Sequence, residues 1–516
     1  MSYLHTIPAA LVAALLVVGS PARGQNPAVV TVRIDAGQPR QTIANFAASD
    51  AWAGQFVGLW PAAKKEAIAD LLFSQEAGPG GQPKGIGLSM WRFNLGAGSA
   101  EQGADSGIKD EWRRAESFLK PDGTYDFTRQ AGQQWFLKAA QQRGVRQFLA
   151  FLNSPPVSLT ANGKAYATKS QTNLTAARYP ALGAYCAAVV KGVKQRTGIT
   201  FDYLSPINEP QWDWSDGGQE GSPFRNPEMA GVAKAVSAAL VAQRLPTQVL
   251  VSEAGKLNYL YETADKPDRG DQLAAFFGNK TAPTYLGGTP RVAPIIAGHS
   301  YFTTSPATQA VAVRRQLAAR VAALPGIVYW QSEYCILGDN DGEINGGPRD
   351  LGIAPALYLA RTVHYDLTVG NAAAWQWWLA ISPYNYKDGL VYVDKNKTDG
   401  QYYPSKMLWA LGNYSRFVRP GAVRLTAQLT DSTQAALPLV SAYRSANGKQ
   451  LVTVVVNDHD APATVHLVLS GKQQLGAGQP YTTSATADLQ PGAAVPAGQP
   501  LRVAPRSITT LVSELR

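Results

Sequence analysis

The sequence predicts an α/β protein in which an eightfold β/α (TIM) barrel is followed by an associated C-terminal β-sandwich. Two patterns predict this fold class. Over residues 42–415, short apolar, β-branched or aromatic runs alternate with stretches of helical periodicity, as in a parallel sheet covered by helices. From residue 416 onward the helical period disappears, and short strand-like runs are separated by Gly, Pro, Asn and Asp.

Eight candidate strands precede the all-β part, and eight is the number that closes a barrel. They are residues 42–48, 88–94, 147–152, 203–207, 249–252, 293–298, 327–332 and 372–378. Apolar residues at helical spacing lie between them, in residues 61–73, 178–196, 227–243, 308–324 and 353–367. In such a barrel the loops after the strands surround one mouth, where functional side chains gather.

Residues 416–516 are expected to form the β-sandwich domain. Its candidate strands are residues 423–428, 451–457, 464–469 and 508–515. The early strand-like run 30–34 precedes the barrel, so the N-terminal segment 25–41 is expected to join the sandwich, and residues 42–415 form the barrel domain. Pro420 and Gly421 offer only a tight turn, which favours fusion of the sandwich to the barrel over a separate module on a linker.

Residues 1–24 read as a secretory signal peptide. Residues 7–19 carry no charge, and the small or turn-forming residues that follow place cleavage after Ala22 or Gly24. No later apolar run reaches the roughly 20 residues of a membrane span. The mature chain is therefore expected to be secreted or periplasmic without stable membrane insertion, a lipid anchor or a retained signal being the alternative.

Composition excludes several other classes. The formal charge of +10 is spread along the chain, without a basic run or an aromatic-basic repeat, so no nucleic-acid partner is expected. Cys186 and Cys335 are the only thiols, too few for a disulfide framework; two buried reduced cysteines are favoured, and pairing between them stays open. No Cys/His spacing indicates a metal, and no cofactor is expected. Oligomeric state stays open.

Two predicted strands end in a carboxylate. In "SPINEP" the fourth strand stops at Asn208 and Glu209, and Pro210 prevents its continuation; in "IVYWQSEYC" the seventh strand stops at Glu333. Barrel closure could bring both glutamates to one mouth. Two carboxylates flanking one bond are what glycoside hydrolysis requires: about 5 to 5.5 Å apart for retention of configuration, roughly 6.5 to 9.5 Å for inversion.

Other acidic residues compete for these roles. Glu253 follows the fifth strand and is the strongest competitor, because that strand also ends in a carboxylate. Asp50 and Asp213 are expected to be loop ligands for backbone or substrate hydroxyls.

The combination of Asn208-Glu209-Pro210 after strand four, Ser332-Glu333 after strand seven and a sandwich tied to both ends resembles glycoside hydrolase family 30. The likeness extends over essentially the mature chain. It implies that Glu209 is the general acid/base and Glu333 the nucleophile, and that Asn208 bonds the sugar 2-hydroxyl. The negative charge of an ionised Glu333 would then keep Glu209 protonated to higher pH. Formation of the glycosyl ester on Glu333 would remove that charge and let Glu209 act as the base.

Further residues match the same family pattern. Arg92 in "SMWRFNLGAGS" resembles the second-strand arginine that donates to the nucleophile, and an arginine in an apolar strand is costly unless paired. His299 and Tyr301 in "AGHSYF" match the sixth-strand pair, with Tyr301 placed to contact the nucleophile.

Aromatic residues near the strand ends are candidate sugar platforms, since indole rings stack on apolar C–H faces. In "AAAWQWWLA", Trp375 and Trp377 share one face and Trp378 takes the other, and we expect Trp375 or Trp377 to form the cleft floor. Trp212 and Trp214, directly after the acid/base, are expected to line subsites. Trp52 and Tyr384 are weaker candidates.

The substrate is expected to be a polysaccharide or oligosaccharide. "SPINEPQWDW", "SMWRFNLGAGS" and "WQSEY" look most similar to the endo-β-1,6-galactanase branch of the family, which implies action on β-1,6-galactan side chains of arabinogalactan proteins. β-1,6-Glucanase, xylanase and glucosylceramidase activities are alternatives within the family. A carbohydrate-binding protein without catalysis, or a sandwich acting as a separate sugar-binding module, are alternatives of another class.

Overall fold

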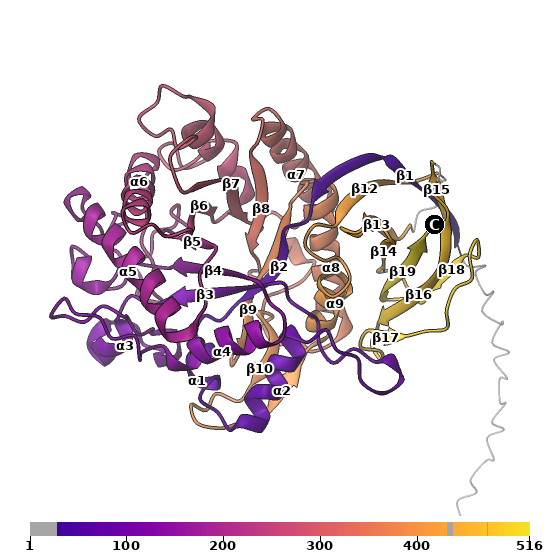
Figure 1. Cartoon of the computed structure of the whole chain (residues 1–516), viewed down its shortest axis with the longest axis horizontal. Coiled ribbons are helices and arrows are strands. Elements are labelled where there is room, and N and C mark those ends of the chain that lie inside the picture. The colour runs from indigo at the N-terminus through magenta and orange to yellow at the C-terminus, as the bar shows by residue number, and fades with distance from the viewer. Residues whose placement is uncertain (1–27, 431–436, 472) are drawn as a thin grey trace, which may run out of the picture.

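The computed structural model describes residues 28–430, 437–471 and 473–516 and contains two sheets (Figure 1). One is built from ten strands and contains the barrel, and the other is built from nine. The predicted signal peptide lies outside the described residues. Within those residues, none of the helices combines the length and apolar character needed to cross a membrane.

Eight parallel strands close into the barrel, because β9 pairs with both β8 and β2. Each predicted barrel strand overlaps one of them, so the predicted fold class is confirmed. The strands are β2 (Asn45–Ser49), β3 (Met90–Leu95), β4 (Gln147–Leu152), β5 (Tyr203–Ser205), β6 (Gln248–Ala254), β7 (Val292–His299), β8 (Val328–Glu333) and β9 (Ala374–Ser382).

The sheet continues beyond closure. β10 (Gly389–Val393) pairs in parallel with β9, and β11 (Tyr402–Pro404) pairs antiparallel with β10. These two strands were not predicted. Gly389 of β10 lies opposite Leu379 of β9, so residues 383–388 form a loop that returns the chain to the side of β9.

Helices surround the barrel (Figure 1). The five predicted helices are present, whereas α1, α3, α4 and α9 were not predicted. The helices are α1 (Gly54–Val57), α2 (Ala62–Phe73), α3 (Ser99–Gln102), α4 (Ala131–Gln142), α5 (Tyr179–Thr197), α6 (Asn226–Ala242), α7 (Ala307–Ala322), α8 (Ile353–Thr368) and α9 (Lys406–Ser415). Close packing constrains them locally: a Cβ on Gly183 in α5 would lie 2.6 Å from the Ala235 carbonyl oxygen of α6.

The C-terminal domain is one sheet in the order β17-β16-β19-β14-β13-β12-β1-β15-β18. It encloses a second apolar core that includes Val32, Leu425, Val455 and Leu511. Its strands are β1 (Ala28–Thr42), β12 (Val423–Leu429), β13 (Leu439–Arg444), β14 (Gln450–Asn457), β15 (Ala463–Ser470), β16 (Leu475–Thr483), β17 (Gln490–Pro491), β18 (Leu501–Val503) and β19 (Ser507–Leu515).

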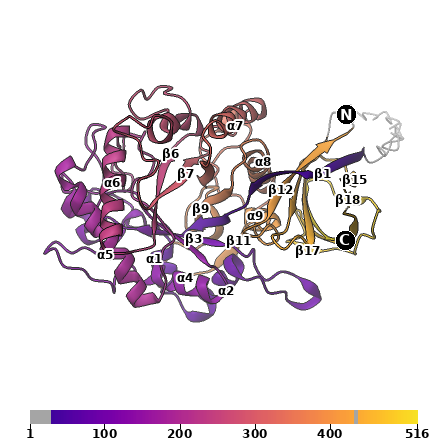
Figure 2. The same cartoon turned by 45° about the horizontal axis from the view of Figure 1, so that its top comes forward.

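The first described strand ties the two sheets together. β1 pairs antiparallel with β12 and in parallel with β15, then leads directly into β2 of the barrel. Figures 1 and 2 both show this strand, in indigo, running from among the yellow strands toward the barrel. The β-domain therefore contains strands from both ends of the chain.

Side chains also join the barrel to the β-domain. α8 and α9 contact strands β13, β14, β16 and β19. The buried Asn413 amide of α9 donates to the Tyr481 carbonyl at 3.2 Å and to the Thr510 hydroxyl at 3.0 Å. These contacts hold the outer helices of the barrel against the sheet.

Candidate active site

A cavity of about 680 Å³ opens where the barrel strands end. Glu209 and Glu333 both line it, with Asn208 beside them. Much of the remaining wall is aromatic, formed by Trp52, Trp212, Trp214, Trp378, Tyr384 and Tyr386. The structure therefore brings the two predicted strand-end glutamates into one cavity.

Glu209 is held by the turn that follows β5. Its N–H donates to the Glu253 carbonyl at 2.8 Å, and its own carbonyl accepts from the Trp214 indole at 2.9 Å. Its φ is 44°, a backbone conformation that is costly for a residue with a side chain and persists where surrounding contacts fix it. The two backbone bonds thus aim the carboxylate into the cavity.

Glu333 is the last residue of β8 and has both carboxylate oxygens bonded. Arg92 Nη1 donates to Oε2 at 2.7 Å, and the Tyr301 hydroxyl donates to Oε1 at 3.1 Å. Arg92 lies in the middle of β3, fully buried, with its guanidinium 4.1 Å from the Phe151 ring centroid. The predicted partners of this carboxylate are therefore in contact with it.

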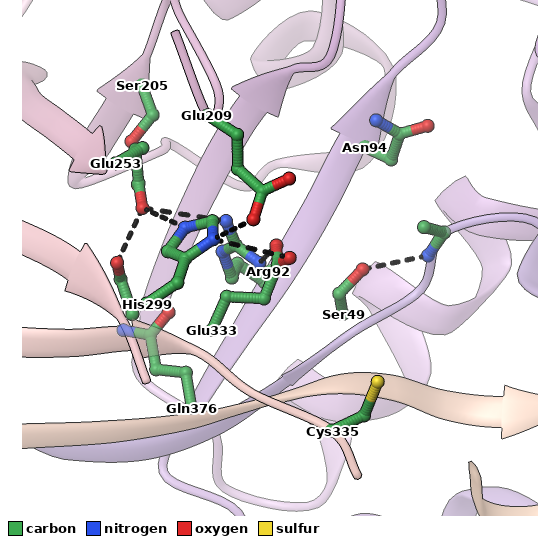
Figure 3. A network of polar contacts seen from close by, with 12 residues as sticks. Ser49, Arg92, Asn94, Ser205, Glu209, Glu253, His299, Glu333, Cys335 and Gln376 are labelled. Carbon is green, nitrogen blue, oxygen red and sulfur yellow. Dashed lines mark hydrogen bonds and ion pairs between the residues drawn. The ribbon is translucent and has the colours of Figure 1, made fainter. Parts of the chain in front are cut away.

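The two cavity glutamates are close to each other. An oxygen of Glu209, an oxygen of Glu333 and a ring nitrogen of His299 all lie within 4.8 Å of one another. Figure 3 shows the three side chains pointing toward a common centre. This spacing agrees with the roughly 5 to 5.5 Å of direct attack and is too short for the wider gap of inversion.

His299, at the end of β7, touches three carboxylates. Its Nδ1 lies 2.9 Å from Glu209 Oε1 and 3.5 Å from Glu333 Oε1, and its Nε2 lies 3.1 Å from Glu253 Oε2. Burial alone would lower the pKa of His299, but the carboxylates, Glu333 first, raise it to about 10. The ring is therefore an imidazolium at neutral pH and donates from both nitrogens.

Glu253 lies behind His299 and does not line the cavity (Figure 3). The Ser205 and Ser332 hydroxyls each donate to it at 2.5 Å, and Arg92 Nη2 is 3.8 Å away. Burial would raise the pKa of Glu253, but Arg92, His299 and Ser205 lower it to about 2. The strongest competitor of the sequence analysis is thus a buried anion away from the substrate space.

Burial raises the pKa of the Glu333 carboxyl above its usual value of 4.5. The positive charges of His299 and Arg92 oppose this rise, whereas Glu209 adds to it when it is ionised. Both cations therefore favour the ionised form of Glu333.

Glu209, His299 and Glu333 are close enough together to surround a cation. Both nitrogens of His299 already donate to carboxylates, however, and a bound cation would have to replace the ring proton and withstand repulsion from Arg92. The geometry therefore favours the handling of protons over the binding of a metal. The observed contacts require no cofactor.

A family model described as O-Glycosyl hydrolase family 30 matches residues 29–392. This match takes in the whole barrel and most of β1. The chain belongs to glycoside hydrolase family 30.

Individual proteins resemble the chain in fold or in part of the sequence. A conserved exported protein from Bacteroides fragilis is 34% identical, with a TM-score of 0.87 over 93% of this chain and 100% of that one. The catalytic domain of the family 30 xylanase C from Talaromyces cellulolyticus shares the fold, with 20% identity and a TM-score of 0.67 over 94% and 99% of the two chains. The glucuronoxylanase XynC from Bacillus subtilis is 26% identical over 165 residues, which span 32% of this chain and only 33% of that relative.

The aromatic predictions for this family 30 chain divide into two groups. Trp212 and Trp214 line the cavity, as do Trp52 and Tyr384. The expectation that Trp375 or Trp377 forms the floor is wrong.

Both of these rings are fully buried outside the cavity. The Trp375 indole donates to Asp366 of α8 at 2.9 Å, and the Trp377 indole donates to the Asp388 carbonyl at 2.7 Å. Alternation along β9 was predicted correctly, but the inward face was assigned to the wrong residues. Trp378 is the strand residue that reaches the cavity.

Sequence reasoning missed polar residues of the cavity wall. Asp388, on the loop before β10, lines the cavity, and burial raises its pKa to about 7. Arg113 also lines the cavity, with its guanidinium 4.7 Å from the Trp52 ring centroid and 5.2 Å from the Tyr384 ring centroid. Asp388 lies in a loop and Arg113 ends a three-residue 3₁₀ helix, Glu111–Arg113, so neither belongs to a segment long enough to show a periodic pattern.

Both cysteines are buried and unpaired. Cys335 lies in the cavity wall, with its sulfur 3.8 Å from the Tyr301 hydroxyl. Burial raises the pKa of the Cys335 thiol well above its usual value, so it is neutral.

Replacing Arg92 by Gln should move the acidic limb of the kcat/KM profile of this family 30 protein to higher pH by about one unit or more. The variant removes the cation that bonds Glu333 and favours its ionised form. The wild-type limb itself should lie above pH 4.5, because burial raises the pKa of Glu333. Steady-state kinetics across pH would measure both.

The matched control is Arg314→Gln, which breaks another fully buried pair, 2.7 Å from Asp366 and away from the cavity. Both variants should lose about 3–5 kcal/mol of unfolding free energy. Only Arg92→Gln should shift the acidic limb; an equal shift in the control, or none in either folded variant, would contradict the role of Arg92.

Proposed function

We propose that this family 30 protein is a secreted retaining glycoside hydrolase that cleaves β-1,6-linked galactan by double displacement. The observation that carries the proposal is the spacing of the two cavity carboxylates, whose oxygens lie within 4.8 Å of each other. A non-catalytic sugar-binding protein would have no need of a buried nucleophile bonded at both oxygens.

In the first half-reaction Glu209 gives its proton to the glycosidic oxygen while Glu333 attacks the anomeric carbon. The leaving chain departs as a neutral alcohol, and a glycosyl ester forms on Glu333. Arg92 and Tyr301 each hold one oxygen of Glu333, which fixes the carboxylate for in-line attack. Asn208 lines the cavity, which supports the role that the family resemblance implies for it, a hydrogen bond to the sugar 2-hydroxyl.

In the second half-reaction Glu209 becomes the base. Ester formation removes the negative charge of Glu333, so Glu209 yields its proton more readily and is left ionised after the first step. It then takes a proton from water as that water attacks the anomeric carbon and releases Glu333. Two inversions at one carbon give net retention of configuration.

Two observations support the choice of β-1,6-galactan. The sequence motifs around Arg92, Glu209 and Glu333 resemble those of the galactanase branch, and the cavity has an aromatic wall. Trp212 and Trp214 follow the acid/base closely in sequence, and Trp378 belongs to the same cavity lining. Such rings suit the apolar faces of a sugar chain. Export is supported by the predicted signal peptide and by the resemblance to the Bacteroides fragilis protein, which is a conserved exported protein.

Glucuronoxylan is a second candidate substrate. Arg113 lines the cavity and has no ion-pair partner among the described residues, so its guanidinium is available to a uronic acid carboxylate. A relative from Bacillus subtilis that matches part of the chain is a glucuronoxylanase.

Nucleophile and acid/base should respond differently to substitution. Glu333→Gln should abolish turnover. Glu209→Ala should lower turnover of unactivated substrates by about 10²–10⁴-fold. With an activated aryl β-glycoside and azide, the Glu209→Ala variant should yield a β-glycosyl azide, because azide needs no base to attack the ester.

Product anomers would be assigned by NMR, and an α-azide would contradict retention. Glu220→Gln is the matched control: Glu220 is buried and bonded by the Ser99 hydroxyl at 2.6 Å, but does not line the cavity. This variant should keep turnover within about tenfold of wild type. A loss as large as that of Glu209→Ala would show that removing any buried carboxylate lowers turnover, which would contradict a specific role of Glu209 as acid/base.

Product profiles on purified β-1,6-galactan, β-1,6-glucan and glucuronoxylan test the substrate. Galactan should give oligosaccharides with kcat/KM about tenfold or more above the other two, the discrimination that a few polar contacts to one hydroxyl can supply. If galactan stays uncut while glucuronoxylan is hydrolysed, and Arg113→Met removes that activity, the second candidate replaces the first.

A further inference from the structure

Five charged or acidic side chains form one network of polar contacts (Figure 3), and two of them belong to the cavity lining. Glu209 and Glu333 line the cavity, whereas Arg92, His299 and Glu253 lie behind them, fully buried. Glu253 comes from β6 and contacts the other two buried groups, at 3.1 Å from His299 and 3.8 Å from Arg92. Glu253 takes no part in either half-reaction of the proposed double displacement.

We propose that Glu253 is a positioning residue whose permanent negative charge holds the proton on His299 and thereby lets Glu209 act as the acid. The inference rests on the proposed double displacement, because it concerns the acid/base of that reaction. Glu253 acts through His299, which bridges it to Glu209.

The contacts of Glu253 make it a fixed anion. Ser205 donates to one oxygen and Ser332 to the other, each at 2.5 Å, and His299 donates to the second oxygen as well. Its side chain is fully buried and outside the cavity lining, so neither substrate nor bulk water reaches it. Hydroxyl and imidazolium donors that all point at one carboxylate stabilise its charged form.

A charge count explains why the reaction needs this anion. Before attack, Arg92 and His299 are positive and Glu253 and Glu333 are negative. The acid role requires a proton on Glu209, so the cluster that starts the reaction is neutral. Formation of the glycosyl ester removes the charge of Glu333 and leaves one net positive charge. Loss of the Glu209 proton restores neutrality, which is the change that the second half-reaction requires.

Without Glu253 the cluster would not be neutral before attack. The resting cluster would carry one net positive charge in a buried, low-dielectric site, and loss of a proton from His299 or Glu209 would relieve it. The other titratable groups at this place do not compensate. Tyr301 and Cys335 stay neutral, because burial raises the pKa of each well above its usual value. Asp388 raises the pKa of the Cys335 thiol further.

The test is the alkaline limb of the kcat/KM profile of Glu253→Gln. Gln keeps the shape of the side chain but not its charge, so the proton shared by His299 and Glu209 should leave at lower pH. The limb should move to lower pH by about one unit or more, the effect of one charge at this distance. Glu253→Asp should keep the limb near its wild-type position, because it keeps the charge.

Ser205→Ala separates charge from structure. It removes one 2.5 Å hydrogen bond from Glu253 but leaves its charge, so the alkaline limb should stay in place even if the protein is less stable. A shift in Ser205→Ala as large as that in Glu253→Gln would overturn the proposal, because the effect would then follow from lost packing.

A second readout does not require turnover. The chain has five histidines, and NMR of ¹⁵N-labelled imidazole rings, with His299 assigned from the His299→Gln spectrum, reports its protonation directly. The wild-type ring should stay charged above pH 8 and should lose its proton at lower pH in Glu253→Gln. A wild-type ring that is neutral at pH 8 would overturn the proposal even if the variant does not fold.

Failure of this inference is distinguishable from failure of the proposed function. An unchanged alkaline limb and an unchanged His299 titration in Glu253→Gln, with the β-glycosyl azide still formed by Glu209→Ala, would refute the role of Glu253 alone. An active Glu333→Gln, or an α-azide, would refute double displacement whatever the histidine spectrum shows.

Discussion

The structure depends on the mutual pairing of charges beneath the barrel mouth. Isolated buried ions are prohibitively costly, and they persist only when paired and hydrogen-bonded. Here the Arg92 guanidinium and the His299 imidazolium lie among three carboxylates, with contacts from 2.7 to 3.8 Å. Each member is tolerated because of the others, so the cluster fixes the position and protonation of the two carboxylates that face the cavity.

Barrel closure makes this pairing possible. The members come from β3, the turn after β5, β6, β7 and β8, which lie far apart in sequence but at neighbouring places around one closed sheet. Because all these strands are parallel, their carboxyl ends meet at the same mouth. The β-domain, which contains β1 from the start of the chain, packs against α8 and α9 and thus holds the outer layer of the barrel in place.

Much of this arrangement could be predicted from the sequence, and the failures have physical reasons. Glu209 and Glu333 were identifiable because each interrupts a buried strand, and Arg92 because an arginine there needs a partner. The Trp375 and Trp377 assignment failed because period-two alternation separates two faces without saying which one points inward. α4 was missed because its glutamine-rich sequence blurs the apolar stripe, and Glu253 because its role depends on contacts between separate strands.

The most direct test of the account is to trap the intermediate. A 2-deoxy-2-fluoro β-galactosyl donor with a good leaving group should slow release of the ester more than its formation, so the sugar should accumulate on the protein. Intact mass followed by peptide mapping should locate one sugar on Glu333. A label on Glu209 or Glu253, or turnover of this donor with inversion and no labelled protein, would contradict the claim that the two paired carboxylates perform double displacement.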